Sequence, residues 1–248
     1  MRSYYTATQS FTYNFSLGIL LLGLYHLTLH LMPGETTTIN AIDHLFQKII
    51  SLIPNGLMIV NICILVGGGF YLFWDYKKGI RLKITYLIFM LLEAIVWSLL
   101  VYFNLSYFVL RIPVVGEMLQ NQIGGAHLLL IPSLQNISLS LGAGFYEELF
   151  FRLILVKIFS LGMLLMLRNP NSLPNAIIIA LTSAILFSAA HTKLLIGELG
   201  EDFRWYNFIY RIVFGLFMSL LIIFRGFGIA AWCHAFYDIW VFSNNPNA

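Results

Sequence analysis

The sequence predicts an all-α protein: a polytopic transmembrane bundle of seven or eight helices. Of its 248 residues, 59% are hydrophobic and 10% are charged, and the mean hydropathy is +0.83. Soluble domains carry about 25% charged residues. Apolar runs of roughly 20 residues recur, which is the length that crosses a lipid bilayer. The net charge of +3 is small and scattered, so we expect no nucleic-acid partner. We expect residues 1–248 to form a single integral-membrane domain.

The first part of the chain contains two expected spans and one interfacial segment. Residues 11–32 form an apolar run that ends at Pro33 and Gly34, because proline cannot continue a helix. Residues 41–53 alternate polar and apolar residues at helical spacing and are expected to lie in the membrane interface. Residues 56–74 form the second span.

A basic loop follows the second span. It carries four cations, Lys77, Lys78, Arg81 and Lys83. Loops rich in Lys and Arg face the cytoplasm, so we expect this loop inside and residues 84–103 as the third span. Residues 124–144 are hydrophobic but contain Pro132, Gln135 and Asn136. They form either a broken span or a re-entrant segment shielded by protein.

Four more helices are expected in the rest of the chain. They cover residues 145–167, 175–196, 205–224 and 229–242. The last is short for a span, so it is tilted or crosses only part of the membrane. Lys and Arg are distributed equally well for either path of residues 124–144, so the membrane face of these helices stays open.

The stretch from Gly144 to Val156 carries three charged residues in an otherwise apolar and aromatic run. They are Glu147, Glu148 and Arg152. One charge at bilayer depth costs about 2.5–3.5 kcal/mol on insertion scales, so three together indicate a function. On an α-helix Glu148 and Arg152 share a face and can form an ion pair. Glu147 would lie about 100° around the axis and face elsewhere, held in place by that pair.

Two later segments add polar groups to apolar spans. His191 lies near the end of its expected span, and His234 and Asp238 share a face of the last helix. Because successive helices alternate in direction, Glu147, His191 and Asp238 are expected towards the same membrane face. A packing role with one hydrogen bond is the alternative for either histidine taken singly.

An acid, two imidazoles and a second acid at one depth can activate water. Glu147 would be the general base. His191 would share the water or carry the proton to the leaving amine, and His234 would donate to the oxyanion of a tetrahedral intermediate. Asp238 would orient His234 or, when protonated, donate to the same oxygen.

The three motifs are Glu-Glu-x-x-x-Arg, Phe-x-x-x-His and His-x-x-x-Asp, in this order. They resemble the motifs of the CPBP family of intramembrane proteases, which includes type II CAAX prenyl endopeptidases and bacterial proteins linked to bacteriocin processing and self-immunity. The resemblance covers residues 144–238 and implies a catalytic core over residues 144–242. The front half of the chain resembles only generic membrane helix.

The resemblance implies four catalytic residues and two supporting ones. The catalytic residues are Glu147, His191, His234 and Asp238. The supporting residues are Glu148 and Arg152. It implies that the first acid and first histidine activate water and that the other two catalytic residues form the oxyanion hole. The family mostly carries asparagine where this chain has Asp238, so this aspartate must be protonated, orient the neighbouring histidine or face a cation. No cofactor is expected; the alternative is Zn²⁺ held by the four catalytic residues.

These observations predict an intramembrane, glutamate-type endopeptidase that cleaves a membrane-anchored or lipidated protein in a bacterial or archaeal plasma membrane. A prenylated CAAX protein, a bacteriocin leader and a C-terminal sorting tail are all compatible substrates. Two other functions stay open: a proton-coupled transporter, which would place charges at several depths, and a catalytically silent immunity or scaffold protein. Glu93 lies mid-span and needs a partner, for which Arg152, Lys157 or a water cavity are the alternatives.

Overall fold

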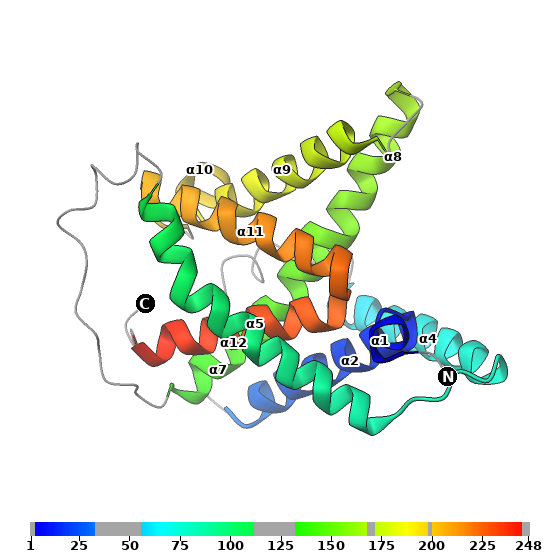
Figure 1. Cartoon of the computed structure of the whole chain (residues 1–248). Coiled ribbons are helices and arrows are strands. Elements are labelled where there is room, and N and C mark those ends of the chain that lie inside the picture. Colours follow the sequence, from blue (N-terminus) through cyan, green and yellow to red (C-terminus); the bar gives the residue numbers. More distant parts are fainter. Residues whose placement is uncertain (1–2, 33–55, 112–131, 168–171, 198–199, 245–248) are drawn as a thin grey trace.

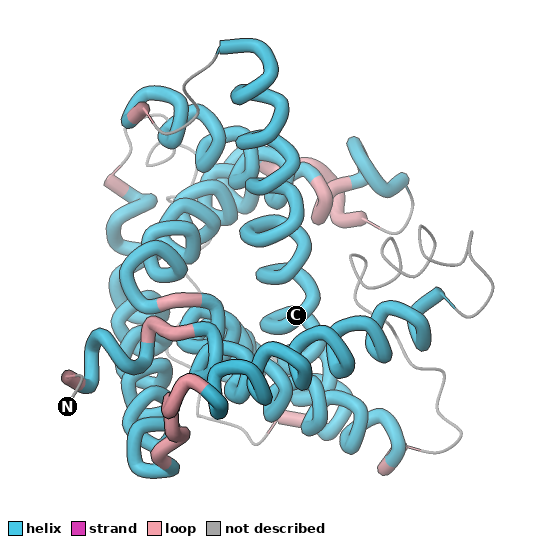
Figure 2. Tube along the Cα trace, turned by 90° about the vertical axis from the view of Figure 1, so that its right-hand side faces the viewer, coloured by secondary structure: helices cyan, strands magenta, loops and turns pink. Residues whose placement is uncertain are grey.

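The computed structural model of this chain describes residues 3–32, 56–111, 132–167, 172–197 and 200–244. These residues form helices joined by short loops, and no strand occurs among them (Figure 2). The predicted all-α class is confirmed. The interfacial segment expected at residues 41–53 and the first part of the 124–144 segment lie outside the described residues.

Five described helical segments are long and apolar enough to cross a membrane. They belong to α2 (Phe11–His30), α4 (Gly56–Lys77), α5 (Ile84–Leu110), the continuous stretch Leu134–Met166, and α11 (Trp205–Arg225). Two further helices, α9 (Leu173–Ala189) and α12 (Phe227–Asn244), complete the bundle in Figure 1. The short α1 (Tyr4–Thr8) and α10 (Lys193–Ile196) lie beside it. The chain is therefore an integral-membrane helical bundle.

The helix that carries the Glu-Glu-x-x-x-Arg motif begins earlier than expected and is not α-helical throughout. It starts as α7 (Leu134–Gly142), continues as the π-helix η1 (Ala143–Ile154) and ends as α8 (Leu155–Leu167). Ser133 caps α7 by accepting a hydrogen bond from the Asn136 N–H at 3.1 Å. The expected start at residue 145 was therefore wrong, and residues 134–144 lead directly into the motif instead of forming a separate broken or re-entrant segment.

The helix α9 ends sooner than expected. Its last residue is Ala189, so the predicted span 175–196 is too long at its C-terminal end. The reason is that the following backbone pairs elsewhere: Thr192 forms an isolated parallel bridge with Glu201. His191 consequently lies in a turn just beyond the helix, not inside it.

The last helix, α12, lies at the centre of the bundle and contacts α2, α5, α7, η1 and α11. Gly226 turns the chain from α11 into α12 with φ of 90°, and a Cβ there would lie 2.3 Å from Asn14 Oδ1. The same oxygen of Asn14 accepts a hydrogen bond from the Gly228 N–H at 2.9 Å. This bond satisfies a backbone donor at the start of α12 and fixes the position of His234 along the bundle.

A partly buried ion pair joins α5 to the C-terminal end of α11. Arg225 donates through Nη2 to Glu93 Oε2 at 2.7 Å and through Nε to Oε1, and Tyr4 donates to the same carboxylate at 2.9 Å. The partners expected for Glu93, Arg152 or Lys157, are therefore not the ones observed. Because α11 and α5 run in opposite directions, the end of one helix lies beside the first half of the other.

Candidate active site

The π-helix η1 places both glutamates of its motif in the protein interior. Its i→i+5 hydrogen bonds widen each turn, so adjacent side chains are separated by a smaller angle than on an α-helix. Glu147 and Glu148 have exposed fractions of 1% and 0%, and Arg152 is buried beside them. Both carboxylates lie beside His234.

Glu148 links Arg152 to His234. Its Oε1 lies 3.5 Å from Arg152 Nη1 and 2.7 Å from His234 Nδ1. The expected Glu148–Arg152 ion pair is present, and the histidine is a second partner that spacing alone did not indicate. With Nδ1 facing Glu148, the His234 Nε2 lies 3.8 Å from Glu147 Oε2 and 3.6 Å from Asp238 Oδ2.

His191 approaches Glu147 from the turn after α9. Its Nδ1 lies 2.9 Å from the carbonyl oxygen of Phe187. A carbonyl can only accept a hydrogen bond, so Nδ1 carries the proton. The lone pair of the neutral ring is then on Nε2, which lies 3.8 Å from Glu147 Oε2.

The four residues expected to be catalytic are therefore brought together from η1, the turn after α9, and α12. The imidazole–carboxylate distances of 3.6–3.8 Å exceed the length of a direct hydrogen bond. They are short enough for one water molecule to bridge the groups. An oxygen of Glu147 and one nitrogen from each ring thus face a common point.

Two phenylalanine rings pack against the imidazoles of this cluster. Phe187 packs edge-on against His191 and His234, with ring centroids 4.8 and 6.2 Å away, and Phe214 packs against His234 at 4.9 Å. The Arg152 guanidinium lies 4.1 Å from the Phe187 centroid, in cation–π geometry. These rings keep the local dielectric low, which strengthens the interactions among the charged groups.

The outer side of the cluster opens into a cavity of about 930 Å³, a size typical of ligand-binding sites. Aromatic side chains make up much of its wall, including Tyr102, Tyr206, Tyr210, Tyr237 and Phe242. Charged side chains from α11 and the loop before it also line the cavity, namely Glu201, Arg204 and Arg211. Sequence reasoning missed all three. Arg211 alone carried a usable signal, because a single arginine in an apolar helix is costly.

The zinc alternative does not fit this arrangement. In the part of the chain that the structure describes, no group of three His, Cys, Asp or Glu side chains is arranged to hold a metal ion. We therefore assign no chemical step to a metal.

Comparison with protein-family models finds a match for the part of the chain that carries this cluster. Residues 129–240 match the family model described as type II CAAX prenyl endopeptidase, Rce1-like. The matched region contains all seven residues named in the three motifs, and the resemblance to CPBP proteases is confirmed. No curated protein and no solved structure matches the chain. The family match supports peptidase activity on protein substrates for this membrane-embedded chain.

Proposed function

From the match of residues 129–240 to the type II CAAX prenyl endopeptidase family, we propose that this protein hydrolyses a peptide bond with a water molecule that Glu147 activates. One observation carries the proposal: Nε2 of His191 and Nε2 of His234 each lie 3.8 Å from the same Glu147 oxygen. A water between these three atoms would be within reach of a base and two rings, as general-base catalysis requires.

Each group has one task in the proposed mechanism. Glu147 takes a proton from the water as its oxygen attacks the scissile carbonyl carbon. His191, whose Nε2 can accept a hydrogen bond, also contacts the water. It then takes the proton from Glu147 and passes it to the leaving amine. His234, held at Nδ1 by Glu148, donates from Nε2 in its protonated form to the oxyanion. Asp238 lies 3.6 Å from that Nε2 and orients the ring.

The proposed substrate is a membrane-anchored or lipidated protein. The cavity leads from the buried cluster to the end of α12, along a wall of tyrosine and phenylalanine side chains. Such a wall suits an apolar anchor beside an extended peptide, because aromatic rings offer large apolar surface and polar edges. A bacterial or archaeal plasma membrane is the location we propose.

The buried charges favour hydrolysis over proton-coupled transport. A transporter needs titratable groups that succeed one another across the membrane. The second pair, Glu93 with Arg225, is partly buried. Glu93 accepts hydrogen bonds from Arg225 and from Tyr4, and neither member of the pair lines the cavity. We therefore propose no transport function.

The proposal is tested by co-expressing the protein with candidate membrane-anchored substrates and measuring their cleavage. Glu147→Ala is expected to lower the cleavage rate about 10²–10⁴-fold, the usual contribution of a general base. His191→Ala and His234→Ala should also lower it strongly. All three variants should accumulate in the membrane as the wild type does. Cleavage by Glu147→Ala at the wild-type rate would reject Glu147 as the base.

A further inference from the structure

The turn that carries His191 is fixed by main-chain hydrogen bonds to a later segment. The Glu201 N–H donates to the His191 carbonyl at 2.9 Å, and the Lys193 N–H donates to the Glu201 carbonyl at 2.9 Å. The imidazole itself is fixed at Nδ1 by Phe187. The position of His191 therefore depends on α9 on one side and on Glu201 on the other.

The side chain of Glu201 ties this turn to α11. Arg211 donates through Nη2 to Glu201 Oε1 at 2.6 Å, and Asn207 donates through Nδ2 to Oε2 at 3.3 Å. Both partners project from the first turns of α11, which also supplies cavity-lining aromatic residues. Both carboxylate oxygens are thus held by one helix, while the main chain of the same residue holds His191.

Gly200, the residue before Glu201, shows how closely its segment approaches the turn after α9. A Cβ on Gly200 would lie 2.3 Å from the carbonyl carbon of Thr192 and 2.5 Å from the nitrogen of Lys193. Real side chains never come so near to backbone atoms. Any residue other than glycine at position 200 must therefore displace the bridge next to His191.

We propose that Glu201 is a positioning residue for His191: α11 holds the Glu201 carboxylate, and the Glu201 main chain holds the imidazole opposite Glu147. This inference rests on the proposed hydrolytic role of His191. The Glu201 side chain is 55% exposed, and ion pairs this exposed contribute little to stability. Losing the carboxylate should therefore act on the rate of the reaction more than on the fold.

The test compares three variants in a cleavage assay with the full-length protein in proteoliposomes. Glu201→Ala removes both contacts to α11 and should lower kcat at least about 10-fold, since a misplacement of about 1 Å can cost about 10²-fold. The midpoint of thermal unfolding should stay near the wild-type value. Glu201→Gln keeps one acceptor oxygen and should restore part of kcat. Gly200→Ala should lower kcat without any change in charge.

Asp202 supplies the matched control. It lies next to Glu201, is exposed, and accepts a hydrogen bond from Lys193 Nζ at 2.9 Å. That bond and the ammonium charge lower the pKa of Asp202, so the neighbour is an ionised carboxylate too. Asp202→Ala leaves the bridge intact and should cleave at the wild-type rate. An equal fall in kcat for Asp202→Ala and Glu201→Ala would overturn the proposal.

Two results separate this inference from the proposed function. If Glu147→Ala is inactive while Glu201→Ala keeps kcat within about twofold of the wild type, well short of a positioning effect, Glu201 has no positioning role and hydrolysis by Glu147 stands. If Glu147→Ala is active, both proposals fail. If Glu201→Ala does not accumulate as a folded protein, Glu201→Gln and Gly200→Ala are used instead. A kcat within about twofold of the wild type in both would then reject the positioning role.

Discussion

At the scale of single residues, Glu148 interacts with two buried groups, Arg152 and His234. One oxygen lies 3.5 Å from Arg152 Nη1 and 2.7 Å from His234 Nδ1. Glu148→Gln keeps the shape but leaves Arg152 without an anionic partner, and breaking a buried pair in this way costs about 3–5 kcal/mol. We expect the free energy of unfolding in detergent to fall by that amount and cleavage to fall with it, because His234 loses its carboxylate.

The double variant Glu148→Gln with Arg152→Met separates these two effects. Replacing both members of a buried pair by uncharged groups is often neutral for stability, so the free energy of unfolding should recover. Cleavage should stay low, since His234 still lacks its carboxylate partner. Recovery of cleavage together with stability would show that Glu148 serves only as the counter-ion of Arg152.

Asp238 occupies the position where the CPBP family, which this chain resembles, mostly has asparagine. Its Oδ2 lies 3.6 Å from His234 Nε2, so its proposed task is to orient that ring. Asparagine has a similar shape and can also hydrogen-bond. We therefore expect Asp238→Asn to keep cleavage within about 10-fold, and Asp238→Ala to lose about 10²-fold, comparable with the loss of one oxyanion-hole donor. Equal rates for the alanine variant and the wild type would remove Asp238 from the site.

The residues that meet in this cluster could be selected from the sequence, because polar groups in apolar helices are costly. Glu147, Glu148 and His234 are polar groups in apolar helices, which a sequence retains only for a reason. Their contacts could not be predicted, because they depend on how distant helices pack together around the π-helix η1. Glu201 was missed since it reaches His191 through its main chain, which no side-chain pattern reveals.

At the scale of elements, the contact between η1 and α12 decides whether Glu147 meets His234. A Cβ on Gly144 would lie 2.5 Å from the Ala231 carbonyl oxygen and 2.8 Å from the Ala235 Cβ. Gly144→Ala must therefore push the two helices apart. Overpacking of this kind costs about 1–3 kcal/mol, and we expect both the free energy of unfolding and the cleavage rate to fall.

Gly162, in α8, provides the control for this change. A Cβ there meets no atom within 4 Å. Alanine is favoured over glycine in a helix interior by about 1 kcal/mol, so Gly162→Ala should leave cleavage unchanged and stability equal or higher. Equal losses in both variants would mean that the approach of η1 to α12 is not what Gly144 provides.

Helices were easier to predict than their ends. Apolar runs predicted α2, α4 and α11 closely, because lipid requires about 20 apolar residues for a span. The early start of α7 was missed since Gln135 and Asn136 look unsuited to a lipid-facing helix, although Ser133 caps it. The end of α9 was missed because the backbone after Ala189 bonds to Glu201, which follows only a few residues later.

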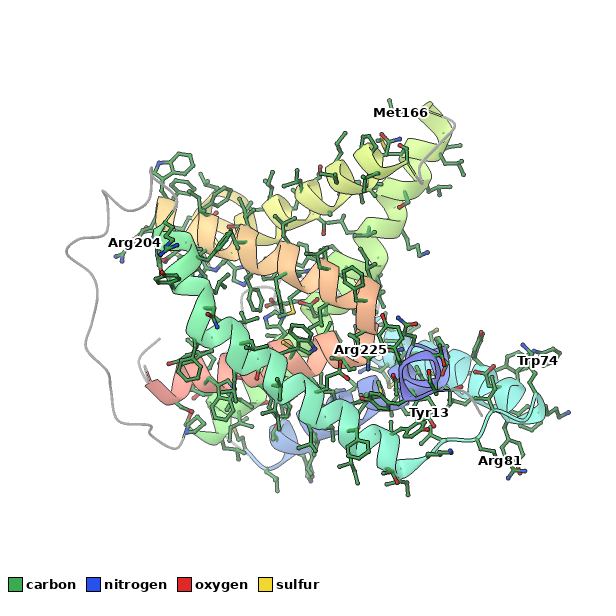
Figure 3. All side chains as sticks on the ribbon, viewed as in Figure 1. Tyr13, Trp74, Arg81, Met166, Arg204 and Arg225 are labelled. Carbon is green, nitrogen blue, oxygen red and sulfur yellow. The ribbon has the colours of Figure 1, made fainter. Side chains whose placement is uncertain are left out.

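At the scale of the whole molecule, the cavity and the basic loop lie at opposite ends of the bundle. In Figure 3, Arg204 lies at one end, and Arg81 and Trp74 lie at the other. Along α5, Tyr102 of the cavity wall is about 28 Å from Lys83, at 1.5 Å per residue. If the basic loop is cytoplasmic, as its charge indicates, the cavity opens towards the other face.

Cysteine labelling in intact cells tests this orientation. The native Cys63 and Cys233 are first replaced by serine, and Asp202→Cys or Lys78→Cys is then introduced. A membrane-impermeant maleimide should label Asp202→Cys from outside and Lys78→Cys only after permeabilisation. The reverse pattern would contradict the orientation. Labelling of both from the same side would contradict the placement of the cavity opposite the loop.

The orientation could not be obtained from the sequence, because either path of residues 124–144 satisfied the distribution of Lys and Arg. The structure joins α7, η1 and α8 into one helix, so the motif lies within a single crossing. The membrane face of the cavity is what the labelling experiment tests. What sequence did provide was the order of the three motifs, and the bundle brings them together.

The central claim is that one buried carboxylate abstracts a proton from a water held near two imidazoles. The most direct measurement is single-turnover cleavage of a bound membrane-anchored substrate by Glu147→Gln in proteoliposomes, because glutamine keeps the shape of the side chain and cannot act as the base. A rate at least about 10²-fold below the wild type, with substrate binding and the midpoint of unfolding unchanged, is the predicted result. A rate within about 10-fold of the wild type, too small a loss for a general base, would contradict the claim.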